Sequence, residues 1–570
     1  MIAKAIQEAL ADERLLKKKR QIVSQMYDER AQWEPTWRKL SEYINPARGR
    51  FDEDNRTSEG KRRDYFLLDP YPMEAHGKCA AGLHSGLTSP SRPWFELSLA
   101  DDDLSNYHTV RLWLDECKDI LMDIYAKSNV YNMLLQIEAE LSQFGTAASL
   151  LLEDYNTAIW ARPYTCGEYA GDVDARGRVT KFARKMRLKA WQMVDEFGEE
   201  IVSDAVLNAY RKDDMRGDFE IYMLIEKNDK YDPSKLALGN FPWKSYYFEG
   251  AETKKFLRLS GFNECPFLMP RWTTIANGIY GTGPGHNALG NCMQLQKLEQ
   301  VNMQLLENRA NPPMIVPSSV GKVNRLPGKT TLVPDGTMSQ GIRPLFEVTG
   351  SREEILQTIQ FKQSQIGSAF FNDLFVMLSQ SDNPQMTARE VAERHEEKLL
   401  MLSPVLEQMH NEVLAPLTKR AFEICLRNGL FPPVPEELNG REESIKAEFI
   451  SLLAQAQKAV ATPAIERTLS LAGNLAGISP DVMDNLNLDD AIRKHAFLTG
   501  TPESIMRDKD DVEKMRAARA EQQAKQQQLE NMAQMADPMY KGVEAARLLS
   551  EIQPEERSIG GILGGEYGHR

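Results

Sequence analysis

The chain has 570 residues, a net charge of −13 and a pI near 5.4. This length suits about three or four domains, and the acidic excess argues against a protein that grips nucleic acid tightly and nonspecifically. Six scattered cysteines are typical of reduced thiols in an intracellular protein. The charged segment Met1–Arg20 and the lack of any apolar run of about eighteen residues predict neither a signal peptide nor a membrane span.

Residues 1–285 predict a mixed α+β domain. Helices are expected at 3–45, 71–88, 105–127, 129–144 and 190–210. Strands are expected at 94–99, 147–153, 157–164, 179–188, 219–227, 245–249 and 256–260. The glycine-rich Tyr280–Gly285 is interpreted as a domain boundary and linker. A phosphate-binding loop is the weaker alternative, because no Gly-Lys-Ser/Thr is present and no strand leads directly into it.

Two helices of nearly equal length are expected next, at 286–310 and 351–373. At 1.5 Å per residue they span about 37 and 35 Å, which favours an antiparallel pair. The proline-rich insertion 311–350 separates them, with short β segments at Met314–Pro317 and Thr330–Val333. The sequence therefore predicts a small β module at the far end of a helical hairpin.

A loop at 374–386 and a long amphipathic helix at 387–429 are predicted after this pair. The capping box Thr387–Glu390 begins the long helix. Pro404 and Pro416 lie inside it, and each is expected to kink the helix because proline removes a backbone donor. A helix of this length must lean on something extended, such as a neighbouring subunit.

The C-terminal part is expected to be helical from 430 to 508, followed by a polar helix and a glycine-rich tail in 509–570. The polar helix has little apolar stripe, so it should be stable mainly in assembly with copies of itself.

No catalytic constellation is predicted. The eight histidines include no HExxH pattern. Asp101–Asp103 and the acidic cluster at 508–511 are interpreted as solvated helix starts rather than metal sites. We therefore expect neither an enzyme nor a cofactor.

Several unusual strings occur in the first 430 residues: 44–51 (INPARGRF), 80–95 (AAGLHSGLTSPSRPWF), 144–148 (FGTAA), 311–313 (NPP) and 386–391 (MTAREV). With this order of parts, the chain resembles the portal proteins, or head-to-tail connectors, of short-tailed bacteriophages. The resemblance covers residues 33 to about 430.

The resemblance implies an α+β, predominantly helical subunit. Its parts would be a wing (1–285), stem helices (286–310 and 351–373), a clip (311–350), a tunnel loop (374–386), a kinked wing helix (387–429), a crown (430–508) and a barrel helix with a flexible tail (509–570). About twelve copies would form a ring at one capsid vertex. Double-stranded DNA would pass through the ring, driven by a separate terminase ATPase. Tail adaptor or nozzle proteins and the major capsid and scaffold proteins would be further partners, with no membrane involved. The location would be the virion, and the host cytoplasm during assembly.

Three sets of residues are candidates for these roles. The tunnel-loop tip that would contact DNA is Ser379, Gln380, Ser381, Asp382 and Asn383. The clip residues that would dock partners are Lys322, Arg325, Lys329 and Arg343. The residues that would pack on neighbouring subunits are Leu298, Leu305, Ile359, Ile366, Leu402 and Leu406. The alternatives are a plain helix–helix connection for the loop and ordinary loop solubility for the clip charges. For the whole chain, the alternative is a capsid-interior scaffold or another helical structural protein.

Overall fold

The structure is a computed structural model of the 570-residue chain. The described residues are 10–51, 67–91, 93–99, 107–213, 217–234, 240–251, 253–316, 343–345, 352–379, 402, 404–438, 445–449, 462–476, 486–499 and 509–534. The chain divides into two compact units, Met1–Ala464 and Ile465–Arg570, which are considered separately.

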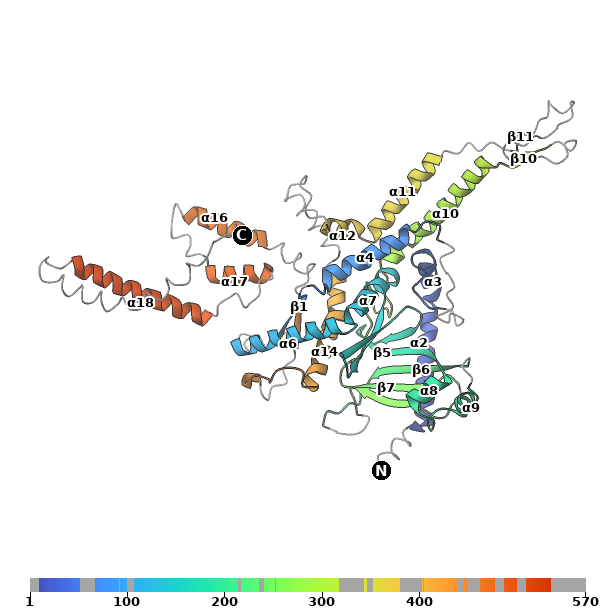
Figure 1. Ribbon diagram of the computed structural model, residues 1–570, viewed down its shortest axis with the longest axis horizontal. Helices are drawn as coiled ribbons and strands as arrows, with labels where there is room; N and C mark the ends of the chain where they lie inside the picture. Colours follow the sequence, from blue (N-terminus) through green and yellow to red (C-terminus); the bar gives the residue numbers. More distant parts are fainter. Residues whose placement is uncertain are drawn as a thin grey trace, which may run out of the picture. The chain divides into compact units, whose positions relative to one another are not determined.

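The first unit mixes helices and antiparallel sheets, as the sequence predicts (Figure 1). Its N-terminal helices are α2 (Glu13–Ala31), α3 (Glu34–Tyr43), α4 (Tyr71–Leu87), α6 (His108–Lys127), α7 (Val130–Phe144), α8 (Ala190–Phe197) and α9 (Asp204–Arg211). Its first strands are β1 (Phe95–Leu99), β2 (Ala148–Asp154), β3 (Ala158–Tyr164), β4 (Tyr169–Val173), β5 (Val179–Lys189), β6 (Asp218–Lys227), β7 (Trp243–Glu249), β8 (Arg258–Phe262) and β9 (Phe267–Leu268).

Helix α7 forms the centre of this unit. Every side chain from Ile137 to Phe144 is buried, including two carboxylates. Glu140 accepts hydrogen bonds from Arg48 at 3.0 Å and from the Thr165 hydroxyl at 2.9 Å. These partners make burial of the carboxylate tolerable, although burial still raises its pKa. Gly145 ends the helix at φ 71°, a left-handed conformation that glycine adopts without strain.

Two sheets extend from this centre. Strand β2 pairs with β3 on one side and with β9 on the other. The second sheet has the order β4-β5-β6-β7-β8, and all its pairs are antiparallel. Side chains of α2 and of the α8–α9 pair form two separate apolar clusters with this sheet, so helices cover it from both faces.

The glycine-rich stretch before the next helix is packed against α7, so its interpretation as a linker is wrong. A Cβ atom at Gly283 would lie 2.6 Å from the Leu141 carbonyl oxygen, and one at Gly285 would lie 2.2 Å from that of Gln143. Only glycine allows two backbones to approach so closely. A glycine-rich sequence alone does not show whether the glycines allow two backbones to pack closely or form a flexible linker.

Helices α10 (Pro284–Ala310) and α11 (Arg352–Ala369) form the predicted antiparallel pair (Figure 1). At the end of the pair, β10 (Met314–Ile315) and β11 (Arg343–Pro344) make a short antiparallel ladder. The second predicted β segment of the insertion, 330–333, lies outside the described residues.

Several boundaries differ from those predicted. The first helix breaks between α2 and α3, and the helix expected at 190–210 breaks at Gly198, whose φ is 86°. Strands β4 and β9 were not predicted. Strand β12 (Ile445–Phe449) pairs along its whole length with β1, so this part of the expected crown belongs to the first unit.

The boundary between the units falls within α16 (Thr462–Ala476). The second unit also contains α17 (Leu488–Thr499) and α18 (Lys509–Gln534), which carries the polar helix expected from the sequence. Arg516 of α18 donates to both carboxylate oxygens of Asp489 on α17, at 2.5 and 2.7 Å. Side chains 513–526 of α18 are all exposed, consistent with the absence of an apolar stripe.

Candidate functional site

The segment expected to form the tunnel loop begins as a helix. After α11, Phe371 adopts a positive φ of 56°, and the chain turns into α12 (Asn372–Ser379). The expectation of a loop from residue 374 is therefore wrong as far as residue 379. The physical reason is burial: Leu374 is 1% and Phe375 is 9% exposed, so these two side chains are fixed by tertiary contacts.

Helix α12 is held in a notch on α4. A Cβ atom at Gly82 would lie 2.2 Å from Cγ of Phe375, so the aromatic ring occupies the space that any other residue would need. Phe370, at the end of α11, meets His76 of α4 edge to face at 6.1 Å between ring centres. Thus α4 positions both sides of the corner between α11 and α12.

His76 acts as a neutral core residue at this corner. Its Nε2 lies 2.9 Å from the Ala139 carbonyl oxygen of α7, and the side chain is 2% exposed. Burial lowers its pKa to about 4, so the ring stays uncharged at neutral pH. The ring therefore packs and hydrogen-bonds α4 to α7.

Asp69, just before α4, ties both helices of the pair to the same element. Its Oδ2 accepts a hydrogen bond from Gln363 of α11 at 2.8 Å, and its Oδ1 accepts one from the Tyr71 backbone N–H at 2.8 Å. Gln296 of α10 accepts from the Asp69 N–H at 3.0 Å and donates to its carbonyl oxygen at 2.9 Å. One 8%-exposed residue thus fixes α4, α10 and α11 relative to one another.

The long helix departs from α geometry next to Pro416. Residues 404–409 are helical, His410–Leu414 form a π-helical segment, and α14 (Ala415–Arg427) carries Pro416 in its first turn. The Ala415 N–H reaches back to the His410 carbonyl, so the wider turn accommodates the proline. Pro404 is exposed near the start of the described part of this helix, and all of residues 387–401 lie outside the described residues.

Buried ion pairs clamp this helix to the sheets. Glu412, in the π-helical segment, pairs with Arg271 and also accepts its backbone N–H at 2.8 Å. Arg420 donates to the Leu151 carbonyl oxygen at 2.9 Å and to Glu264 at 3.1 Å. Burial lowers the pKa of Arg420, while the Glu264 carboxylate opposes that effect. The contacts fix the helix that follows the expected loop, just as α4 fixes the helix that precedes it.

The predicted tunnel-loop and clip residues fall mostly outside the description. Ser379 is the last residue of α12, and Arg343 lies in β11. The others, Gln380, Ser381, Asp382, Asn383, Lys322, Arg325 and Lys329, lie outside the described residues.

Four of the six residues predicted to pack on a neighbouring subunit lie in the core of the chain itself. Their exposed fractions are 4% for Ile359, 0% for Ile366, 0% for Leu402 and 9% for Leu406. Leu298 and Leu305 are partly exposed. The apolar stripes of α11 and the long helix are therefore covered within one chain. The prediction was wrong for these four residues because helical spacing shows that a face is covered, without showing which chain covers it.

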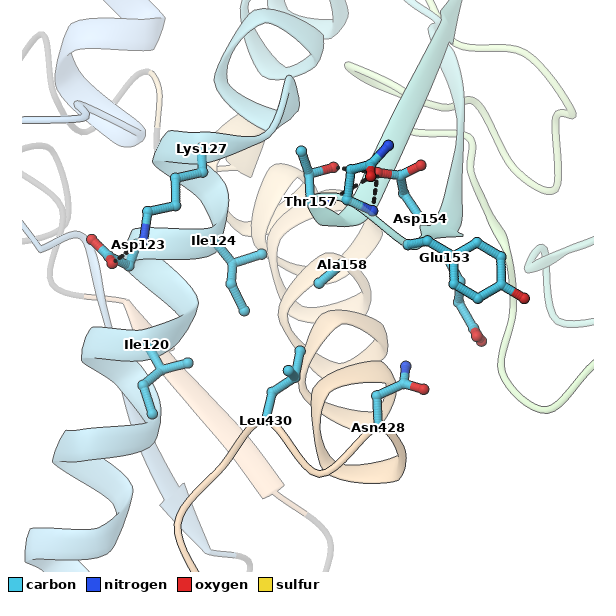
Figure 2. Close-up of a pocket in the computed structure, with 12 residues that line it drawn as sticks. Ile120, Asp123, Ile124, Lys127, Glu153, Asp154, Thr157, Ala158, Asn428 and Leu430 are labelled. Atoms are coloured by element: carbon cyan, nitrogen blue, oxygen red, sulfur yellow. Dashed lines mark hydrogen bonds and ion pairs between the residues drawn. The ribbon is translucent and has the colours of Figure 1, made fainter.

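A pocket of about 700 Å³ lies between α6, the turn joining β2 and β3, and the loop after α14 (Figure 2). Its polar groups are already engaged. Asp123 pairs with Lys127 at 2.8 Å, and Asp154 accepts the Thr157 N–H at 2.8 Å and its hydroxyl at 2.9 Å. These local bonds leave no convergent acid, base or nucleophile, and the sequence offered no signal for the pocket.

The described part of the chain contains no group of three His, Cys, Asp or Glu side chains arranged to hold a metal ion. Burial raises the pKa of the Cys117 and Cys425 thiols to about 12, which keeps them protonated. Among the same residues, no helix has the length and apolarity needed to span a membrane.

Comparison with known proteins gives a consistent result. Residues 16–506 match the family model described as bacteriophage head to tail connecting protein. The chain is 37% identical over 520 residues to the probable portal protein of Bordetella phage BPP-1, covering 91% of this chain and 93% of that protein. It is 34% identical over 553 residues to the portal protein of Salmonella phage epsilon15, covering 96% of each.

Similarity to solved structures is weak. A chain in the virion of a native gene transfer agent particle gives a TM-score of 0.34 at 11% identity, covering 72% of this chain and 87% of that one. A chain in the neck of an empty particle of the same kind gives 0.35 at 10% identity, covering 76% and 93%. TM-scores this low do not show that the folds are the same.

Proposed function

Because this chain belongs to the bacteriophage head to tail connecting protein family, we propose that it forms a ring at a single capsid vertex. The ring, of about twelve copies, is the channel for genome packaging and ejection. The observation that carries the proposal is the identity of 34–37% to two phage portal proteins over 91–96% of this chain.

The channel role is supported by the two helices that precede and follow the expected tunnel loop in the chain. Helix α12 leads into it from a notch on α4, and the clamped helix of residues 404–427 follows it. These two described helices lie on either side of residues 380–403, and we expect the polar segment within that stretch to reach toward DNA. The segment Ser379–Asn383 has one charged residue, so it can hydrogen-bond to phosphates without a strong ionic grip.

The partner role is assigned to the end of the α10–α11 pair. Lys322, Arg325, Lys329 and Arg343 concentrate positive charge in one short insertion of a protein whose net charge is −13. A basic surface there would attract an acidic partner. The partners are the terminase ATPase during packaging and the tail adaptor or nozzle proteins afterwards. The chain itself supplies no catalysis and needs no cofactor in this scheme.

The discriminating experiment removes the chain from an otherwise complete phage assembly system. A portal is needed for DNA to enter, so capsids made without the chain should have normal diameter and contain no DNase-protected DNA. The rival, an interior scaffold protein, predicts misassembled or wrongly sized shells instead. Normal shells that fill with DNA in its absence would contradict the proposal.

A further inference from the structure

Two arginine side chains near the meeting of the two larger sheets have no ionic partner among the residues that the structure describes. Arg162 lies on β3 and Arg184 lies on β5. Their guanidinium carbons are 6.0 and 4.5 Å from the centre of the same ring, that of Tyr164. Over the described ranges, neither side chain makes a hydrogen bond or an ion pair.

Polar atoms at this place are buried without a partner. They are Nε of Arg184 and the hydroxyl oxygen of Tyr164. Glu168, a carboxylate that acts on both groups electrostatically, is already paired with Arg50. Burial, and then the neighbouring Arg162 charge, lower the pKa of Arg184. These two buried atoms are closed to an outside partner, but Arg162 itself is exposed, so a negatively charged acceptor from outside would be attracted to its guanidinium.

The chemistry of the site fits carboxylates on a protein surface. Its accessible charged group is the exposed Arg162 guanidinium, and Trp160, two residues along β3 from Arg162, is 42% exposed. Arginine, tyrosine and tryptophan side chains are the residues that most often dominate protein–protein contacts. The chain's net charge of −13 disfavours the phosphates of a nucleic acid as the occupant.

Helix α6 presents a matching acidic stripe. Glu116, Asp119 and Asp123 are exposed and lie on one face of the helix, because they are three, four and seven residues apart. The Asp119 and Asp123 side chains are 76% and 68% exposed. Leu112, one turn earlier on the same stripe, is 51% exposed. Lys127 pairs with Asp123 at 2.8 Å and Lys118 lies 3.8 Å from Asp119, so Glu116 and Asp119 are the carboxylates that this stripe offers beside Leu112.

The two surfaces lie on different elements of the first unit. Arg184 lies on the five-stranded sheet, which extends toward the opposite side of the view from α6 (Figure 1), whereas Arg162 lies on β3 of the other sheet, whose turn with β2 lines a pocket with α6. A ring of identical subunits requires two different, complementary surfaces on each copy. We propose that Arg162 and Arg184 bind the acidic stripe of α6 on the adjacent copy of this chain. This inference rests on the proposed ring.

The test combines charge reversal with charge exchange. The variant Arg162→Glu/Arg184→Glu should form rings that dissociate at lower salt, because each contact between neighbours is weakened about ten-fold or more. Adding Glu116→Arg and Asp119→Arg should restore wild-type salt resistance. Arg176→Glu, in the exposed turn before β5, is the matched control and should behave as wild type.

Native mass spectrometry across a salt series provides the measurement, and circular dichroism verifies folding of each variant. If wild-type protein makes no rings, the proposed function fails. If wild-type rings form and the reversed variant resists salt equally well, the inference about this interface is overturned. The same conclusion follows if the reversed variant is folded but the exchange variant does not regain rings.

Discussion

Substitution of Gly82 by alanine tests how α4 holds α12. The added methyl group would lie 2.2, 2.3 and 2.8 Å from three ring carbons of Phe375, so the whole ring must move. Phe375 is 9% exposed and packs in a dense core, so there is little room for it to shift. Overpacking of this kind costs about 1–3 kcal/mol in the free energy of unfolding.

Gly77 provides a matched control on the same helix. A Cβ atom there meets nothing within 4 Å. Gly77→Ala should therefore stabilise the protein by about 0.5–1 kcal/mol, the ordinary gain for glycine to alanine in a helix. The two variants make the same chemical change in α4 and should shift stability in opposite directions.

Urea denaturation and hydrogen exchange of α12 amides are the assays. Gly82→Ala should lower the free energy of unfolding and speed exchange across residues 372–379. Adding Phe375→Leu, which shortens the ring side chain, should recover part of the loss. If Gly82→Ala and Gly77→Ala give equal stability and equal exchange, α4 does not position α12 in the way described.

Four further outcomes are expected. Pro416→Ala restores a backbone donor, so the π-helical segment should become α-helical and turn Glu412 away from Arg271. The variant should then form fewer closed rings in native mass spectrometry. An unchanged fraction of rings would show that the π-helical segment is not needed for assembly. His76→Gln should make the protein less sensitive to acid, because the pKa of His76 is about 4 in the folded chain and about 6.5 in the unfolded chain. The free energy of unfolding of the wild type should therefore fall by up to about 3 kcal/mol as the pH drops through this window, and that of the variant should fall less. Equal pH curves from urea denaturation would contradict this. Reversing Lys322, Arg325, Lys329 and Arg343 to Glu should leave rings intact and abolish adaptor capture in a pull-down; unchanged capture would remove these residues from the docking surface. Deleting Ser379–Asn383 should allow DNA entry yet reduce DNase-protected DNA per capsid over time; retention equal to wild type would leave this segment a connector.

Local sequence signals predicted the elements that depend on local physics. Helices α10 and α11 follow from helical spacing and composition and form within a few residues of their expected ranges, and α18 lies at the start of the segment expected to hold the polar helix. The antiparallel pair with a β-containing end could likewise be inferred from two equal helices around a proline-rich insertion.

The features that were missed depend on residues distant in sequence. The α12 helix needs the notch at Gly82, and β12 needs β1 as its partner. A short apolar or alternating segment does not reveal such a partner. The same holds for the arginine site, since Arg162 and Arg184 look like ordinary surface charges until the fold brings both to the Tyr164 ring.

The error over subunit packing has the same origin. Ile359 and Ile366 form a genuine apolar stripe, but periodicity says only that a helix face is covered. It does not say whether the cover comes from the same chain or from a second copy. The structure places these residues in the chain's own core, so in the proposed ring exposed side chains would make the contacts between subunits.

Electron microscopy of the purified full-length protein tests the central claim most directly. A portal-type subunit should assemble into closed rings with a central hole wide enough for duplex DNA, and class averages viewed along the axis should show about twelve repeats. Monomers, filaments or solid helical bundles, seen across conditions in which the chain is folded, would contradict the account.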